Sequence, residues 1–300
     1  MEILTLDKYL KQTFGCKVYK LSLSTGATCP NRDGTFSYGG CAFCSEGGSG
    51  DFASSFDSLE NQIKKAKLLV DKKFPKKISS ENRKYIAYFQ SFTNTYGNQE
   101  KLKSLFKKTL EFTEIAALSI ATRADCLSNE MIDFLSELNK KKPVWIELGF
   151  QTVHQKTHLL LNTKFSLEVF EKIYAKLKEK GICVIAHVIL GLPGESEAEM
   201  KQSVKYLASL TPVLDGIKLQ LLHILEGTEL AQMYREKPFK IFSLEEYCRL
   251  VVDCLKLLPP QTVIHRMTGD GPKKILVEPK WSADKKRVLN TLNKMIREEN

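Results

Sequence analysis

The chain has 300 residues, 43% of them hydrophobic and 27% charged, which is the composition of a folded globular protein rather than a disordered one. No run approaches the roughly 18–20 consecutive apolar residues of a membrane-spanning helix, and the first residues lack the basic and apolar stretches of a signal peptide. We therefore expect a cytoplasmic protein with no membrane partner. In that compartment cysteines stay reduced, and a cysteine cluster more often binds metal than forms disulfides.

The net charge is +10, because 45 Lys and Arg residues stand against 35 Asp and Glu residues, and lysine makes up most of the excess. A positive field of this kind favours encounters with polyanions such as RNA. Lysines on solvated helix faces explain the charge equally well. The charge therefore agrees with an RNA partner without requiring one.

Short, β-branched apolar segments alternate along the chain with amphipathic ones. The predicted strands are 18–22, 85–89, 117–121, 144–150, 183–190 and 216–224, with 262–267 as a candidate seventh. The predicted helices are 58–73, 99–113, 128–140, 166–180 and 197–209, and Ser243 with Glu246 marks the start of another. Alternating strands and helices imply parallel strands with helical crossovers.

This order predicts an α/β fold, a partial (β/α)6 barrel whose catalytic groups gather at the carboxyl ends of the strands. We expect residues 1–270 to form the barrel domain, with a cysteine loop near its N-terminus. Residues 271–300 would form a C-terminal extension. Its helix, roughly 282–298, carries an apolar stripe suited to docking onto the barrel.

Three cysteines follow the first predicted strand, Cys29, Cys41 and Cys44. Three thiolates are one short of the four that a closed zinc or iron–sulfur site takes, so one metal position would stay open for chemistry. Cys16 is the alternative fourth ligand of a structural zinc site, but it precedes the strand that the loop follows, so we expect it at the opposite end. Cys126 is a geometrically feasible ligand and equally a small buried residue.

The ending Cys41-Ala42-Phe43-Cys44 resembles the cysteine signature of the radical S-adenosylmethionine (SAM) enzymes, whose loop follows the first strand of a partial barrel. The long gap between Cys29 and Cys41 is similar to that of the branch containing the elongator catalytic subunit. The chain most resembles the YhcC-type bacterial family of this superfamily. The resemblance implies a [4Fe–4S] cluster held by Cys29, Cys41 and Cys44, with SAM on the fourth iron and an electron donor such as flavodoxin or ferredoxin.

The resemblance also implies a SAM pocket at the strand ends. Phe43 would shield the cluster near the adenine. The second strand is followed by four polar residues where the superfamily often has Gly-Gly-Glu, and these would meet the methionyl part of SAM: Gln90, Ser91, Thr93 and Asn94. Capping of a helix is the alternative role for the threonine and asparagine.

The third and fourth strands end in motifs similar to those of the elongator branch. Arg123, in Thr-Arg-Ala-Asp, would pair with a carboxylate of the cofactor, or else with Asp125 as a structural ion pair. Glu147 lies within an apolar strand and needs a partner there, either the ribose diol of SAM or else a helix dipole or an arginine. Gln151 matches a residue that contacts the methionyl part of SAM, with Asn162 or Lys164 as helpers.

The last two strands complete the expected pocket. Leu190 would pack on adenine and Gly191 permits the tight turn of Gly-Leu-Pro-Gly-Glu. Three residues would supply backbone contacts to adenine, with the histidine also a candidate for the substrate pocket: Leu222, His223 and Ile224. His187 is predicted to be a satisfied core histidine rather than a metal ligand.

The favoured function is radical SAM chemistry on RNA, with tRNA as the substrate class that the elongator resemblance implies. The first alternative is the same chemistry on a small metabolite, a porphyrin-like molecule or a peptide, with segment 265–272 closing over the substrate. The second is a zinc-stapled RNA-binding protein without catalysis. The substrate atom and the product do not follow from the sequence.

Overall fold

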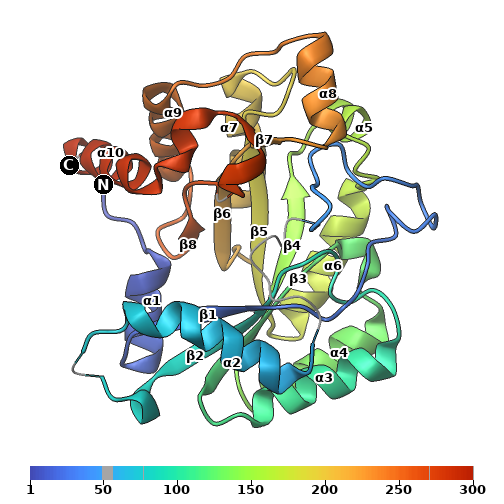
Figure 1. Cartoon of the computed structure of the whole chain (residues 1–300), viewed down its shortest axis with the longest axis vertical. Helices are drawn as coiled ribbons and strands as arrows, with labels where there is room; N and C mark the ends of the chain where they lie inside the picture. The colour runs from blue at the N-terminus through green and yellow to red at the C-terminus, as the bar shows by residue number, and fades with distance from the viewer. Residues whose placement is uncertain (49–56, 77, 270, 300) are drawn as a thin grey trace.

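The computed structural model describes residues 1–48, 57–76, 78–269 and 271–299. Its main feature is a parallel sheet that curls into a partial barrel (Figure 1). The strands, in spatial order, are β1 (Val18–Leu23), β2 (Lys84–Phe89), β3 (Ile115–Thr122), β4 (Val144–Gln151), β5 (Cys183–Leu190), β6 (Gly216–Leu221) and β8 (Val263–Arg266). The predicted α/β barrel is confirmed, and segment 262–267 contains its seventh strand.

Helices pack on the outer face of this sheet, each between successive strands. They are α2 (Leu59–Val70), α3 (Gln99–Glu111), α4 (Asn129–Asn139), α6 (Leu167–Glu179), α7 (Glu197–Ala208) and α9 (Leu244–Lys256). The capping boxes predicted at Ser196–Glu199 and Ser243–Glu246 start α7 and α9. The outward strand residues, such as Leu118, pack against the apolar stripes of these helices in the main hydrophobic core.

Shorter elements close the two ends of the barrel. Helix α1 (Leu6–Phe14) lies at the amino ends of the strands, whereas α5 (Gln155–Leu160) and α8 (Glu229–Glu236) lie near their carboxyl ends (Figure 1). Single 3-10 turns occupy Asp71–Lys73, Ser80–Asn82, Ala124–Cys126, Lys273–Ile275 and Lys280–Ala283. Within the described residues, no helix is both long and apolar enough to cross a membrane.

Because strand side chains alternate between faces, the inward residues stack in layers inside the barrel. The lowest layer is apolar and packs against Leu10 of α1: Val18, Ile86, Ala117, Trp145 and Ile185. The layer two residues further along the strands is polar: Lys20, Tyr88, Ser119, Glu147, His187 and Lys218. We call these sets the apolar floor and the charged layer.

The predicted end of the sixth strand is wrong, because the chain leaves the sheet after Leu221 rather than Ile224. The amide of Leu222 donates to the carbonyl of Leu190, and the chain then turns into β7 (Ile224–Leu225). This short strand pairs antiparallel with β9 (Leu276–Glu278) in a second, two-stranded sheet. The apolar residues on both sides of the turn, Leu221, Leu222, Ile224 and Leu225, concealed the break.

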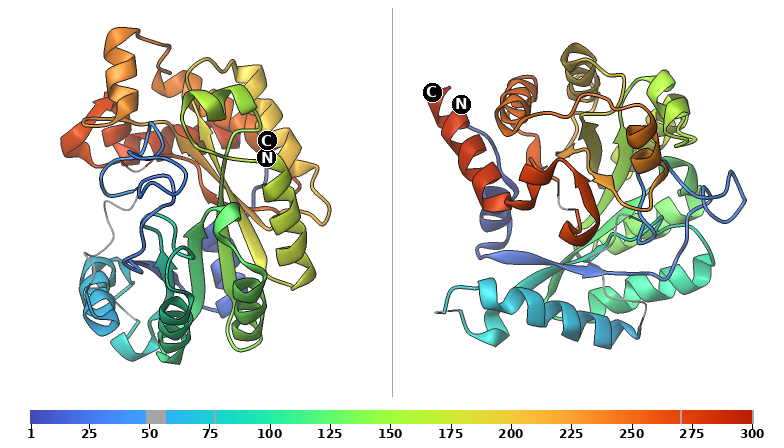
Figure 2. Two further views of the ribbon diagram at one scale, coloured as in Figure 1. Left: turned by 90° about the vertical axis from the view of Figure 1, so that its right-hand side faces the viewer. Right: turned by 45° about the horizontal axis from the view of Figure 1, so that its top comes forward.

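The C-terminal helix α10 (Lys285–Glu298) packs beside α9, as Figure 2 shows, and buries Val288, Leu292 and Ile296. The apolar stripe of α10 therefore lies against a helix of the barrel. The amino group of Met1 donates to the carbonyl of Ile296, so the two ends of the chain meet. A division into domains at residue 270 stays a prediction.

Candidate active site

A cavity of about 260 Å³ opens at the carboxyl ends of the strands and reaches the charged layer inside the barrel. The cavity is bordered by the three loop cysteines, Cys29, Cys41 and Cys44. Eight further predicted cofactor residues also border it: Phe43, Gln90, Thr93, Arg123, Glu147, Gln151, Leu222 and His223. The fold therefore brings together groups that lie almost 200 positions apart in the sequence.

The remaining predicted cofactor residues do not border this cavity: Ser91, Asn94, Lys164, Leu190, Gly191 and Ile224. Asn94 is fully buried, and its side-chain amide donates to the carbonyl of Ala121 at 2.9 Å. Leu190 belongs to the main core, and Ile224 lies in β7. A cofactor contact from these six residues stays a prediction. The alternative role of capping α3 belongs to Asn98 instead.

Main-chain hydrogen bonds on both sides fix the end of the cysteine loop. The amide of Ala42 donates to the carbonyl of Leu161 at 3.0 Å, and the amide of Leu230 donates to the carbonyl of Ala42 at 2.8 Å. Ala42 is buried in a cluster that also contains Leu222 and Ile224. Helices α5 and α8 thus hold Phe43 and the neighbouring cysteines against the cavity.

The thiols themselves lie among groups suited to anionic sulfur. The side-chain amide of Asn31 donates to the sulfur of Cys41 at 3.4 Å, and the Arg123 guanidinium exerts a favourable electrostatic effect on the same thiol. A hydrogen bond with Cys44 and then burial nonetheless raise the pKa of Cys41 well above its ordinary value. A bound metal would supply the positive charge that holds such a thiol as thiolate.

No three cysteine, histidine or carboxylate side chains of the described residues converge closely enough to hold a single metal ion. In an iron–sulfur cubane each cysteine binds a different iron, so its ligands are spread more widely than those of one ion. Cys16 belongs to the apolar floor at the opposite end of the barrel from the cysteine loop, as predicted. Cys183 also packs there, whereas Cys248 and Cys254 are buried in the main core.

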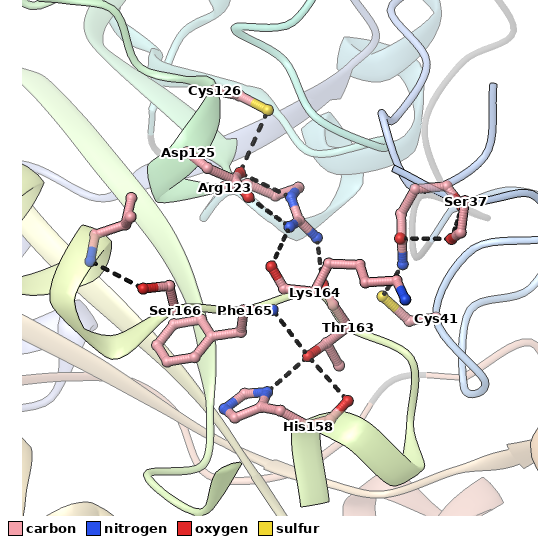
Figure 3. Close-up of polar contacts among 12 residues, drawn as sticks. Ser37, Cys41, Arg123, Asp125, Cys126, His158, Thr163, Lys164, Phe165 and Ser166 are labelled. Carbon is pink, nitrogen blue, oxygen red and sulfur yellow. Dashed lines mark hydrogen bonds and ion pairs between the residues drawn. The ribbon is translucent and has the colours of Figure 1, made fainter. Parts of the chain in front are cut away.

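The segment after α5 connects this loop to the third strand, as Figure 3 shows. Arg123 forms a bidentate ion pair with Asp125, at 2.9 and 2.6 Å, and also donates to the carbonyls of Thr163 and Lys164. The structural ion pair that we considered for Arg123 is therefore present. His158 bonds the hydroxyl of Thr163 at 2.7 Å, and burial lowers its pKa.

Backbone strain occurs at the rim of the cavity, at Phe92 and Gln151, and in the segment after α5. Among the described residues, the non-glycine residues with positive φ angles are Phe92 after β2, Gln151 at the end of β4, and Asn162 and Lys164 after α5. Gln151 folds over Gly149, where an added Cβ would lie 2.6 Å from the amide nitrogen of Gln151. Such strain persists only where the surrounding structure enforces it, and it is typical of functional sites.

Glu147 is the centre of the charged layer, and its side chain is completely buried. Its carboxylate accepts hydrogen bonds from Lys20 at 2.6 Å and Ser119 at 2.6 Å, and lies 2.7 Å from the ring of His187. Lys218 forms a further ion pair with it. Burial alone would raise the pKa of Glu147, but the cations hold it well below its ordinary value. A protein partner thus already satisfies this carboxylate, and a ribose contact stays a prediction.

Burial also shifts the pKa values of two other side chains in this layer. Burial lowers the pKa of Lys218 to about 7, while its ammonium donates to the hydroxyl of Tyr88 at 2.9 Å. Burial also lowers the pKa of His187 to about 4, so this histidine is neutral at pH 7. It is satisfied by Glu147, as predicted, but it also borders the cavity.

Sequence reasoning missed the cations of the barrel interior, Lys20, Lys218 and Arg266. Each lies in or at the end of a strand that otherwise reads as apolar. The signal was present in the alternation of the strands: Lys20 is two residues from Val18, and Lys218 is two residues from Gly216, on the inward face. Within segment 265–272, Arg266, Gly269, Gly271 and Pro272 border the cavity, although Arg266 belongs to β8 of the barrel. Closure of this segment over a substrate stays a prediction.

Comparison with known proteins identifies the family of the chain. Residues 24–207 match the model of the Radical SAM superfamily, and residues 214–298 match that of the Radical_SAM C-terminal domain. The chain is 42% identical to YtqA of Bacillus subtilis (strain 168), over 97% of this chain and 88% of that protein. It is 31% identical to YhcC of Escherichia coli (strain K12), over 96% of this chain and 90% of that protein.

More distant relatives have a longer chain. A tRNA uridine(34) acetyltransferase of Methanocaldococcus infernus is 27% identical over 60% of this chain and 34% of its own. The solved structure of the archaeal M. infernus Elp3 shares the fold, with a TM-score of 0.67, 19% identity and coverage of 93% of this chain and 63% of that one. The chain therefore belongs to the radical SAM superfamily, as an enzyme of its YhcC-type family, and this superfamily uses a [4Fe–4S] cluster and SAM.

Proposed function

We propose that Cys29, Cys41 and Cys44 hold the [4Fe–4S] cluster and that the adjoining cavity binds SAM and a substrate on RNA. The observation that carries this proposal is the convergence of the three cysteines on one cavity that continues into the barrel. When bound, the reduced cluster supplies the electron that cleaves SAM to a 5′-deoxyadenosyl radical. The protein holds these groups in place and keeps water away from them.

The side chains at the rim of the cavity are suited to holding the cluster and SAM. Phe43 forms an apolar wall beside the cysteines, where it would shield the cluster. Gln90, Thr93 and Gln151 provide polar groups at the carboxyl ends of β2 and β4, where the amino acid part of SAM would be bound. Gln151 is held in a strained conformation beside Gly149, so its amide needs little further ordering when a ligand arrives.

Three observations support RNA, with tRNA as the class. The chain carries a net charge of +10, and one of its relatives is a tRNA uridine(34) acetyltransferase. The cysteine loop also presents two exposed aromatic rings, Phe36 and Tyr38, with the Arg123 guanidinium 5.8 Å from the centre of the Phe36 ring. Exposed rings beside a cation are suited to stacking on unpaired bases.

The cofactor assignment is tested by anaerobic reconstitution of four alanine variants. Cys29→Ala, Cys41→Ala and Cys44→Ala should lose the iron–sulfur absorption band and all release of 5′-deoxyadenosine from SAM with a reductant, flavodoxin or ferredoxin being the protein donors to compare. Cys16→Ala, in the apolar floor, is the matched control and should keep both. Retained SAM cleavage in any of the three variants would remove that cysteine from the ligand set.

The RNA assignment needs a separate measurement. Bulk tRNA should bind the reconstituted enzyme, and its affinity should fall steeply with salt concentration. The nucleosides of tRNA from cells with and without the gene should then differ in at least one modified base. Unchanged nucleosides together with no tRNA binding at low salt would contradict an RNA substrate and favour a small metabolite or peptide.

A further inference from the structure

The charges that border the cavity are not balanced. Among the described residues, its basic groups are Arg32, Arg123, Lys218 and Arg266, whereas its carboxylates are Asp125 and Glu147. Arg123 is neutralised by Asp125 at the rim. Inside the barrel, the single carboxylate of Glu147 is shared between Lys20 and Lys218. The interior of the cavity therefore carries more positive than negative charge.

Arg266 is the clearest sign of this excess. It ends β8, where it pairs in register with Lys218 of β6, and it borders the cavity. Within the ranges that the structure describes, its guanidinium forms no ion pair and no hydrogen bond with the protein. A partly buried guanidinium placed beside another cation is costly unless an anion reaches it.

Lys218 and Arg266 lie on neighbouring strands, and both border the same cavity. Lys218 contacts Glu147 and the Tyr88 hydroxyl on one side, and Arg266 lies next to it along the sheet edge. Ammonium and guanidinium groups together are the usual donors to carboxylates and phosphates. Their backbone positions are fixed by strands rather than by loops, so the site exists before a ligand binds.

We propose that Lys218 and Arg266 form an anion subsite inside the barrel, which binds a carboxylate or phosphate group of the substrate. This deepens the proposed function, on which it rests, by giving the substrate a negative charge at the end that enters the cavity. The subsite lies along the strands below the cysteine loop. SAM itself would be bound above it, at the rim.

The ionisation of Lys218 gives the subsite a dependence on pH. The groups that face its ammonium are Glu147 of β4, Lys20 of β1, Tyr88 of β2, His187 of β5, and His265 and Arg266 of β8. Because burial lowers the pKa of Lys218 to about 7, the lysine is charged below that pH and largely neutral above it. Anion affinity should therefore fall as the pH rises through 7.

Calorimetric titration of the reconstituted enzyme with sodium sulfate and with sodium acetate tests this subsite directly. Both probes keep a constant charge between about pH 6 and 9, so a change in affinity over this range reports the protein. We expect saturable binding that weakens severalfold from pH 6 to 8. Tighter sulfate binding would assign a phosphate-bearing substrate, and tighter acetate binding a carboxylate-bearing one.

Two variants locate the binding. Arg266→Gln should raise the dissociation constant of the preferred anion by about tenfold or more, because it removes a charge-assisted contact. Arg297→Gln, on the exposed side of α10, is the matched control for loss of one positive charge and should bind as the parent does. Circular dichroism and iron content establish that both variants fold. If Arg266→Gln does not fold, Lys218→Met replaces it, and the pH titration needs no variant.

Three results would overturn the subsite: no saturable binding of either anion, equal binding by the two arginine variants, or complete displacement of the anion by SAM. The last would assign the cations to the carboxylate of SAM. These outcomes are independent of the proposed function, because SAM cleavage and tRNA binding are measured separately. Loss of tRNA binding with an intact anion subsite would instead overturn the RNA substrate alone.

Discussion

The apolar floor and the charged layer occupy neighbouring levels of the same strands, yet they differ in almost every physical respect. The floor packs Val18, Trp145 and Ile185 against α1 and excludes water. The charged layer, two residues further along, surrounds Glu147 with lysines and a histidine. Stability explains the first arrangement, since apolar burial is favourable at every position.

Stability does not explain the second arrangement. Replacing buried ion pairs by apolar residues of similar size is often neutral or stabilising, so a charged layer is weak evidence of a stabilising role. This layer borders the cavity, whereas the floor lies beneath it. The barrel interior therefore changes from a packed apolar level to a polar, cavity-lining level over a single step of two residues along its strands.

The largest expected effect on stability falls in the floor. Trp145→Ala should lower the free energy of unfolding by about 3–5 kcal/mol, because it removes a buried ring that contacts Tyr9 and His265. Urea denaturation followed by circular dichroism measures the loss. Leu160→Ala, at an exposed position of α5, should change the value by less than about 0.5 kcal/mol. A small loss of unfolding free energy in Trp145→Ala would contradict the stabilising role of the apolar floor.

Next comes the carboxylate of the charged layer. Glu147→Gln should lower the free energy of unfolding by about 2–3 kcal/mol, because Lys20 and Lys218 then lie buried without a counter-charge. The same urea titration at pH 7 gives the value. Unchanged stability would mean that the lysines reach water in the cavity without loss.

The pH dependence of this second effect provides a sharper measurement. The folded protein holds the pKa of Glu147 well below its ordinary value of 4.5, so its stabilisation is complete above that pH and is lost as the pH falls toward the folded-state pKa. The difference in unfolding free energy between the parent and Glu147→Gln should therefore shrink on acidification below about pH 4.5. A difference that stays constant down to pH 3 would contradict the ion-paired state of Glu147.

The smallest effect on stability is expected at Lys218. Burial lowers its pKa to about 7, so its charged form is costly in the folded protein. Lys218→Met should therefore change the free energy of unfolding at pH 7 by less than about 1 kcal/mol. Thermal or urea unfolding gives this value, and anion titration of the same sample gives the functional loss. If Lys218→Met is strongly destabilised but binds anions normally, then Lys218 stabilises the fold and does not bind the anion.

Much of the fold was predictable from local pattern. Alternating apolar strands and amphipathic helices gave the barrel, and Ser196 and Ser243 marked helix starts correctly. The cysteine spacing was equally local, and it pointed to the family that the comparisons show. The end of the sixth strand was not predictable in this way, because apolar residues continue at Leu222 although the main chain turns away. The short helices α1, α5 and α8 were not predicted either.

The charged layer was harder to predict from the sequence, because its side chains come from six different strands. Glu147 stood out in its apolar strand, but its partner Lys20 lies 127 positions earlier. The sequence of one strand does not determine which inward residues of the other strands lie at the same level of the barrel, because that depends on the register between neighbouring strands. Pairing of Lys218 with Arg266, for example, follows a shift in register after Ile217.

The wide separation of these partners has a kinetic consequence. Glu147 can leave water without penalty only when β1, β5 and β6 are all in place, and those strands span most of the chain. Contacts of such long range close late, after much of the loop entropy has been lost. We expect the carboxylate to be solvated in the transition state of folding. Its replacement should then speed unfolding while leaving the rate of folding almost unchanged.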